Sequence, residues 1–238
     1  MPDYAVLLAI FTTLFLAVSL TAMVSHGLTL ADVAPDAKRR FGITLGVTIM
    51  VWVALVGALS YSGAVEPNAD RAFPTLGILI LGSAILGNVM WALSATAQAV
   101  LKIIPSWWLA AIQLYRIVGV VFILLAADGI LSNYFAQTTG WGDIAVGLAA
   151  PFVALLLWID ERRFRYFAVI WCVAGIPDLL TVLFKTLLTA SGPMQIDIDI
   201  PTVIIGQFPF AFIPLLVVPI SLILHVQLMR KLLGATKA

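Results

Sequence analysis

Charged side chains inside apolar segments are the first candidates for chemistry in this sequence. Arg116, Asp178 and Lys185 each lie within a long stretch of mostly apolar residues. An ionised side chain at the centre of a bilayer costs about 2.5 kcal/mol or more, so it normally faces the protein interior and finds a partner. At a rise of about 1.5 Å per residue, Arg116 lies at the middle of its segment and Asp178 close to the same level. The sequence therefore predicts a polar site near the middle of a membrane.

Three uncharged polar residues are expected to join this site. Asn88 lies at the middle of another apolar segment, Gln113 lies one helical turn before Arg116, and Tyr115 adds a phenol. Arginine offers a planar fork of donors to a carboxylate or an anion, and Asp178 could balance its charge or exchange a proton. The alternative is an Arg116–Asp178 ion pair that only holds helices together, since desolvation often offsets the attraction within a buried pair.

Lys185 and Asp143 are two further candidates for binding a ligand or a proton. Lys185 follows Asp178 by two turns on the same helix face, roughly 10 Å further along the helix. Its amine can therefore extend to the membrane interface or meet Asp143. Residues 140–143 read Gly-Trp-Gly-Asp, which is typical of a glycine turn followed by an N-capping aspartate, so capping is the expected role of Asp143.

His26 and His225 are the histidines of the chain, and imidazole can ligate haem iron or relay protons. If the first and last helices are neighbours, these two rings could hold a non-covalent haem b. The alternative is that His26 is an interfacial residue and His225 a hydrogen-bonded packing residue. A retinal Schiff base needs a lysine in the middle of the last helix, and residues 202–230 contain none. We therefore expect no cofactor.

Composition excludes several classes of protein. Of 238 residues, 62% are apolar and 11% are charged, whereas a soluble domain is roughly half apolar and about a quarter charged. The net charge of +1 provides no basic surface for nucleic acid. The lone cysteine, Cys172, excludes an internal disulfide and a cysteine metal cluster. No H-E-x-x-H, P-loop or G-x-S-x-G motif is present, which argues against an enzyme.

The remaining class is a polytopic membrane protein. A membrane-spanning helix needs about 20 mostly apolar residues, and seven segments qualify, near 4–23, 41–62, 75–100, 106–126, 143–158, 164–188 and 207–229. Their connections are short, so residues 1–238 are expected to form one transmembrane domain. The sequence predicts an all-α bundle of seven transmembrane helices.

Basic residues predict the orientation of the bundle. One set of loops and the C-terminal tail hold ten of them, and the opposite set holds Arg71 alone. The positive-inside rule then predicts an outside N-terminus and a cytoplasmic C-terminus, in a plasma or inner membrane. The ten are Lys38, Arg39, Arg40, Lys102, Arg162, Arg163, Arg165, Arg230, Lys231 and Lys237.

Glycine and proline patterns predict where helices pack and bend. Glycines in the second and third spans (Gly42, Gly46, Gly82 and Gly87) indicate close helix packing. Three prolines in the seventh span (Pro209, Pro214 and Pro219) indicate a bent or partly unwound helix, which could be a moving part. Within the connection 190–206, residues 191–201 alternate apolar and polar types, which fits an extended flap or an ordinary interfacial loop.

Three functions fit these patterns. The first is a small carrier, channel or sensor for a small polar or anionic solute, or for protons, which uses the midplane polar site. The second is an electron-transfer membrane subunit with haem between His26 and His225. The third is a structural subunit of a larger membrane complex. The expected partner is the lipid bilayer. A small-molecule ligand, a homo-oligomer and a larger membrane complex stay open as further partners, and nucleic acid is not expected.

Overall fold

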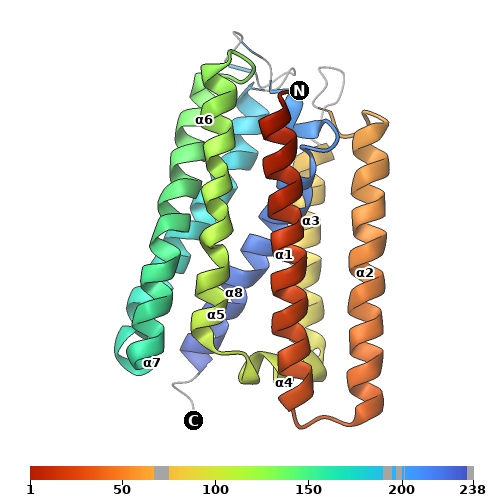
Figure 1. Cartoon of the computed structure of the whole chain (residues 1–238), viewed down its shortest axis with the longest axis vertical. Coiled ribbons are helices and arrows are strands. Elements are labelled where there is room, and N and C mark those ends of the chain that lie inside the picture. Colours follow the sequence, from red (N-terminus) through yellow and green to blue (C-terminus); the bar gives the residue numbers. More distant parts are fainter. Residues whose placement is uncertain (67–74, 190–194, 197–199, 201, 235–238) are drawn as a thin grey trace.

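The computed structural model is an all-α bundle (Figure 1), and it describes residues 1–66, 75–189, 195–196, 200 and 202–234. Within these residues six helices are long and apolar enough to cross a membrane, which supports the prediction of a multi-pass membrane protein. They are α1 (Asp3–Leu30), α2 (Pro35–Tyr61), α3 (Thr75–Leu93), a rod made of α5 (Ser106–Ala111), η1 (Ile112–Gly119) and α6 (Val120–Ala127), α7 (Asn133–Thr189), and a rod made of η3 (Ile213–Val217) and α8 (Val218–Gly234).

The two composite rods form the centre of the bundle. Most residues of the α5–η1–α6 rod and of the η3–α8 rod are buried, whereas α2 buries only Val56 and Ser60. Two apolar clusters fill the space between these rods and the surrounding helices, one in each half of the bundle. The central rods are therefore the elements that can hold polar side chains away from lipid.

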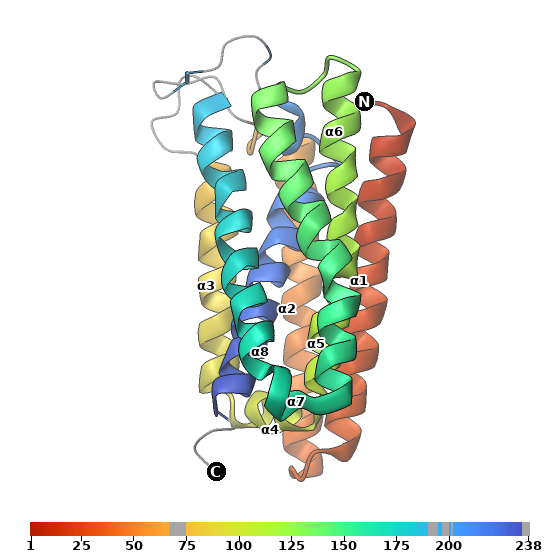
Figure 2. The ribbon, with the colours of Figure 1, turned by 90° about the vertical axis from the view of Figure 1, so that its left-hand side faces the viewer.

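Helix α7 is a hairpin of two long arms. Asp160 has extended backbone angles (φ −157°, ψ 93°) that break the helix, and its Oδ1 accepts a hydrogen bond of 3.1 Å from the backbone N–H of Arg163, as an N-cap does. The arms, residues 133–159 and 161–189, run back along each other (Figure 2). The fifth span was predicted at 143–158 after a loop; the structure corrects this, because the helix already begins at Asn133.

The third span also differs from the prediction. It was expected over 75–100, but α3 ends at Leu93 and a separate short helix, α4 (Ala95–Ile103), follows. The Ser94 hydroxyl caps α4 by accepting a 3.2 Å bond from the Ala97 N–H. At the other end of α4, the Lys231 ammonium donates to the Leu101 and Lys102 carbonyls at 2.8 and 3.1 Å. α4 therefore lies across one end of the bundle (Figure 1).

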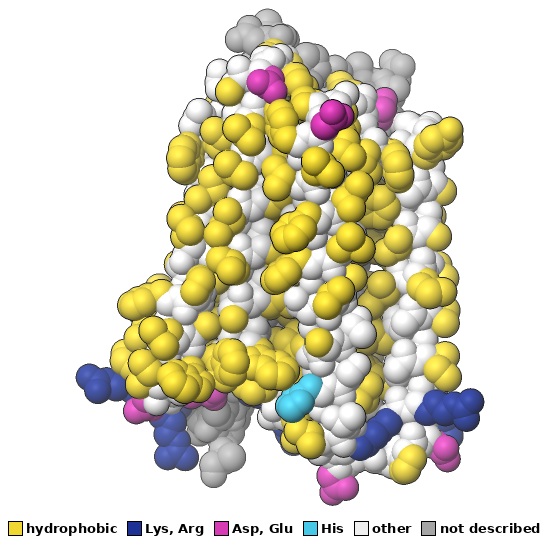
Figure 3. All heavy atoms as spheres, viewed as in Figure 1, with side chains coloured by type: hydrophobic (Ala, Val, Ile, Leu, Met, Phe, Trp, Pro, Cys, Tyr) yellow, Lys and Arg dark blue, Asp and Glu magenta, His cyan; other side chains and the backbone are white. Residues whose placement is uncertain are grey.

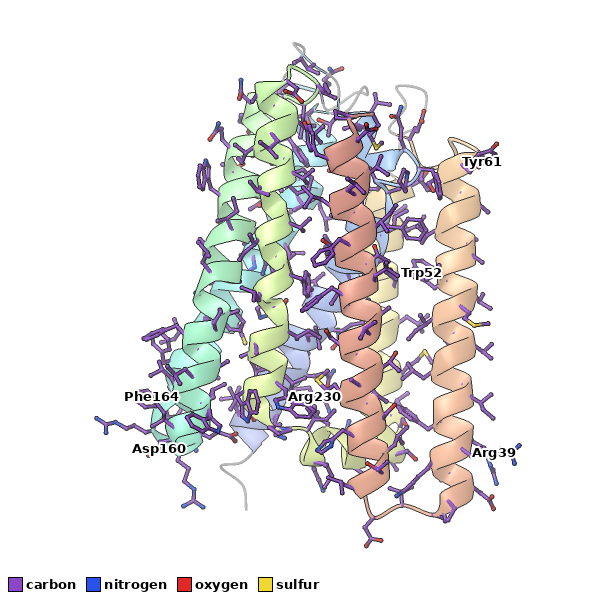
Figure 4. All side chains as sticks on the ribbon, viewed as in Figure 1. Arg39, Trp52, Tyr61, Asp160, Phe164 and Arg230 are labelled. Carbon is purple, nitrogen blue, oxygen red and sulfur yellow. The ribbon has the colours of Figure 1, made fainter. Side chains whose placement is uncertain are left out.

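The seventh span is irregular where its prolines occur. It begins at Ile213 rather than at Gln207, and residues 213–217 form a π-helical segment that contains Pro214. Pro219 has no N–H, so the Leu215 carbonyl loses its usual helical partner. The Trp52 indole of α2 takes that place and donates to the Leu215 oxygen at 2.9 Å (Figure 4). One side chain of α2 thus completes the hydrogen bonding of a central helix.

Replacing Trp52 with phenylalanine should test this attachment. A buried carbonyl without its donor costs about 1–3 kcal/mol, so the variant should melt at a lower temperature than the wild type in detergent. The matched control is Trp158→Phe, because Trp158 is 66% exposed at the end of its arm. Equal melting temperatures for the two variants would show that the Trp52 bond contributes nothing to stability.

The glycine pairs in α2 and α3 do not pack as predicted. A methyl group added at Gly46 or Gly82 would meet nothing within 4 Å, and one at Gly42 would meet only the tip of Leu28. Gly87 alone lies against another helix, where it contacts Ile223 of α8. A further group of closely packed glycines surrounds Arg116 and is described below.

Basic side chains gather at one end of the bundle. Lys and Arg gather at the end that carries the C-terminus, as the face in Figure 3 shows. This is called the basic end; Arg39, Asp160 and Arg230 lie there, and Tyr61 lies at the opposite, N-terminal end (Figure 4). The predicted flap falls on residues 191–201, of which 191–194, 197–199 and 201 lie outside the described residues.

Candidate functional site

Arg116 lies at the middle of a central rod in an unusual stretch of backbone. The segment η1 is a 3₁₀ helix of 8 residues between two α-helical pieces, longer than most such runs, and 3₁₀ stretches within helices often mark functional positions. The Arg116 side chain is 1% exposed. Local backbone and burial together place a full positive charge in the core.

Every N–H of the Arg116 guanidinium has an acceptor within reach. Nε donates to Asp143 Oδ1 at 2.8 Å, and Nη2 contacts the same oxygen at 2.7 Å. Nη2 also pairs with Asp178 Oδ2. Nη1 donates to the Gly175 carbonyl at 3.4 Å and lies 3.2 Å from His225 Nε2. A guanidinium carries five N–H donors, so these contacts use its full capacity.

The partners of Arg116 come from three segments. Asp143 is on the first arm of α7, Gly175 and Asp178 are on the second arm, and His225 is on α8. One arginine therefore ties both arms of the hairpin and the last helix to the central rod. We call Arg116, Asp143, Asp178 and His225 the arginine cluster.

Glycines create the space in which the arginine cluster fits. A methyl group at Gly142 would overlap the Asp178 carboxylate, and one at Gly175 would lie 2.7 Å from His225 Nε2 and 3.2 Å from Arg116 Nη1. A methyl at Gly119 would lie 2.5 Å from the Asp143 Cβ. Approaches under 3.0 Å are too close for real atoms, so a side chain at Gly119, Gly142 or Gly175 would force its neighbours to move.

The arginine cluster is not balanced in formal charge. One guanidinium faces two carboxylates, which leaves one excess negative charge when both are ionised. His225 does not offset it, because Arg116 can only donate, so the facing Nε2 must be the acceptor of a neutral ring. His225 Nδ1 is buried and has no hydrogen-bond partner among the described residues. The cluster thus lacks one positive charge in a low-dielectric environment.

Tyr115 and Gln113 form a separate polar group one turn along α8. The Tyr115 hydroxyl pairs with the Ser221 hydroxyl, and the Gln113 amide donates to the Ser221 carbonyl at 3.3 Å. Ser221 precedes His225 by four residues and so lies on the same helix face. The structure therefore brings Gln113 and Tyr115 next to the arginine cluster without a described contact to Arg116.

Two other predicted site residues lie elsewhere. Asn88 accepts a 2.8 Å bond from the Gln227 amide and donates to the Ala84 carbonyl of its own helix. Lys185 does not meet Asp143, because its ammonium lies 2.9 Å from the centre of the Tyr134 ring. The expected capping role of Asp143 is also corrected, since Asp143 lies inside α7 and pairs with Arg116.

The two histidines make separate contacts. His26 is exposed near the end of α1, and its ring lies 4.9 Å from that of Trp108. His225 is buried, with Nε2 at Arg116 and its ring centre 4.9 Å from that of Trp171. No contact among the described residues joins the two imidazoles, and haem binding stays a prediction.

Some parts of the site had only weak signals in the sequence. His225 was noticed as a histidine but not as a partner of Arg116, and Ser221, four residues earlier, marks the same face of the helix. The Gly175 carbonyl carries no sequence signal at all. Gly140 and Gly142 predicted a turn, but two residues apart on a helix they lie on different faces, and Gly140 meets Ile123 and Gly119 while Gly142 meets Asp178.

Comparison with known proteins places the arginine cluster within a family. No curated protein and no solved structure matches the chain. A family described as a domain of unknown function (DUF8737) matches residues 73–233, about two thirds of the chain. The matched range contains the whole arginine cluster and leaves out α1 and α2. The chain is therefore a multi-pass membrane protein that belongs to the DUF8737 family.

Proposed function

We propose that this protein binds and releases a proton at the arginine cluster and acts as a proton-responsive carrier or sensor in the plasma membrane. The observation that carries the proposal is the set of contacts around Arg116, in which three titratable side chains share one buried guanidinium. The proposal keeps the proton version of the sequence-based hypothesis. It sets aside the version in which a small anionic solute binds Arg116.

The hydrogen bonds that Arg116 already makes argue against the binding of a solute anion. A solute anion would need free donors, and all five N–H groups already have protein acceptors. Binding an anion would therefore displace an aspartate from the guanidinium and leave it buried without a partner, which costs several kcal/mol. A proton needs no free donor and adds the positive charge that the cluster lacks.

The unequal positions of the two aspartates suggest what protonation would do. Asp143 receives two contacts from Arg116 and its side chain is 10% exposed, whereas Asp178 receives one and is 16% exposed. Asp178 is the better proton acceptor on this geometry. A neutral Asp178 would be held less strongly by Arg116, which would loosen the second arm of α7 while the first arm stays attached through Asp143.

We infer that both arms of α7 cross the membrane, which gives seven crossings with the basic end in the cytoplasm. Each arm, 133–159 and 161–189, exceeds the roughly 20 residues that a crossing needs. Arg162, Arg163 and Arg165 follow the break at Asp160 and are suited to a cytoplasmic loop. In this orientation the N-terminus is outside.

Proton uptake by the purified protein tests the proposal. An acid pulse that stays well above the range in which exposed aspartates take protons, about pH 4, is applied to protein in weakly buffered detergent and followed with a pH indicator. It should show about one bound proton in the wild type that Asp178→Asn lacks. Asp128→Asn is the matched control, because Asp128 is exposed and its hydrogen bond within the described residues is to Tyr4 at the N-terminal end. If Asp178→Asn takes up as many protons as the control and only melts earlier, the cluster is a structural lock and the proposal is wrong.

A further inference from the structure

We infer that the seam between the two arms of α7 is a water-filled path that leads from the N-terminal end of the bundle to Asp178. Lys185 and Tyr134 close the outer mouth of this path. The inference rests on the proposed function, because it names the route by which a proton would reach the cluster. It concerns residues outside the contacts of Arg116.

Polar residues on the second arm form one stripe. Asp178, Thr181 and Lys185 are separated by three and four residues, so they lie on one helix face and ascend toward the N-terminal end. The Thr181 hydroxyl donates to the Asp178 carbonyl of its own helix at 2.6 Å. Its oxygen keeps lone pairs that can accept a hydrogen bond from water.

A matching stripe runs along the first arm. Tyr134, Thr138 and Gly142 recur every four residues and share a face. Thr138 is exposed, and its hydroxyl donates to the Tyr134 carbonyl at 3.4 Å. Gly142 has no side chain, so the place beside it is open for a polar group from the other arm.

Contacts at both ends of the stripes put them opposite each other. The Lys185 ammonium lies 2.9 Å from the Tyr134 ring centre, and Gly142 lies directly against the Asp178 carboxylate. Because the arms are antiparallel, the residues between these two contacts, Thr138 and Thr181, fall at the same level. The seam therefore carries polar groups over about two helical turns.

Accessibility within the arginine cluster increases toward the seam. The Arg116 side chain is 1% exposed, that of Asp143 is 10% and that of Asp178 is 16%, while His225 is buried. Residues beside Asp178 on the outer surface of the hairpin, Ala174 and Pro177, are exposed. A carboxylate that opens toward hydrocarbon would be very costly, so water in the seam is the environment that suits it.

Charged and titratable side chains face both ends of the seam. Arg116 from η1, Asp143 from the first arm and His225 from α8 face the inner end of the seam, and Lys185 lies at its outer end on the same arm as Asp178. A lysine over an aromatic face is held by cation–π attraction that is modest when exposed. Lys185 can therefore leave Tyr134 and open the mouth at low cost.

Cysteine accessibility tests the path. The lone native Cys172 is buried and is first replaced by alanine; Thr181→Cys is then compared with Phe184→Cys in proteoliposomes. Phe184 is 65% exposed and lies about one turn nearer the end of the arm. A positively charged, membrane-impermeant methanethiosulfonate should modify Thr181→Cys several-fold faster than Phe184→Cys, although position 181 is deeper. Lys185→Gln should raise the rate further, and Thr138→Cys provides a second seam position if Thr181→Cys does not fold.

The outcomes separate the path from the proposed function. Modified Thr181→Cys should take up protons more slowly but in the same number as the unmodified protein. If Thr181→Cys and Thr138→Cys react no faster than Phe184→Cys, the seam is dry and the inference is wrong, even where Asp178→Asn still loses its proton. If the seam positions react quickly but modification leaves the uptake rate unchanged, the seam holds water and does not supply Asp178, which also overturns the inference.

Discussion

Replacing Arg116 with glutamine is expected to lower the free energy of unfolding by about 3–5 kcal/mol, the usual cost of removing one partner of a buried ion pair. The side chain of Asp143 is 10% exposed, and its described hydrogen bonds and ion pair are with Arg116 alone. Without the guanidinium it must either stay charged in a low-dielectric core or take a proton. Thermal unfolding in detergent, or unfolding by a denaturant that the bundle tolerates, would measure the loss.

Two comparisons make the Arg116 result specific. Arg230→Gln removes an exposed arginine that bonds to Gln227 at 3.2 Å, and its effect should stay within about 1 kcal/mol, as for surface pairs. The double variant Arg116→Gln/Asp143→Asn should recover part of the loss, because the neutral amide no longer needs a cation. A loss for Arg116→Gln no larger than that for Arg230→Gln would contradict the described contacts.

Adding a methyl group beside the arginine cluster should also be strongly destabilising. We expect Gly142→Ala to cost about 1–3 kcal/mol, the usual range for overpacking a tight core, because its Cβ would overlap the Asp178 carboxylate. Gly175→Ala should cost a similar amount, since its Cβ would lie 2.7 Å from the His225 ring. Melting temperatures of the two variants would measure both effects.

A glycine in open space provides the control for these two variants. A methyl at Gly82 meets nothing within 4 Å, and alanine is favoured over glycine in helices by roughly 1 kcal/mol. Gly82→Ala should therefore leave the melting temperature unchanged or raise it. If Gly142→Ala behaves like Gly82→Ala, the hairpin has room to adjust, and glycine is not required for the contact between Gly142 and Asp178.

These two results bear on function as well as stability. The arginine cluster joins both arms of α7 through one guanidinium, and the arms meet at the break of Asp160. The hairpin is therefore held at the Asp160 break and at the arginine cluster. When the contacts at the arginine cluster weaken, the free ends of the two arms can move. Protonation of Asp178 would weaken these contacts, which gives the proposed sensor or carrier a physical means of changing shape.

Several features could be predicted because they depend on local sequence alone. Apolar segments of sufficient length predict membrane-spanning helices wherever they fold, since the bilayer demands internal backbone hydrogen bonds. The cost of a charge in hydrocarbon is likewise a property of the residue and its segment. For this reason Arg116 and Asp178 could be identified before their partner contacts were known, and the structure pairs them.

Helix boundaries were harder because glycine has two roles. Gly140 and Gly142 resemble a turn, yet in α7 they lie within the helix and permit close contact with η1 and with the second arm. Ser94 is the reverse case: a serine within a mostly apolar segment gave no reason to expect a break, but in the structure α3 ends at Leu93 and Ser94 caps the next helix. Whether such residues break a helix or pack within it depends on which neighbour is present.

The sequence by itself determined that this chain is an all-α membrane protein and that its rare charged residues within apolar segments need partners. Depth along a helix follows from residue number, so Asn88 and Arg116 could be predicted to lie near the middle of their segments; each lies within a helical segment long and apolar enough to cross a membrane. Rotation about the helix axis and the choice of neighbour do not follow from depth. Only the tertiary structure therefore decided that Asn88 bonds to Gln227, that Lys185 lies over Tyr134, and that Asp143 and His225 complete the shell of Arg116.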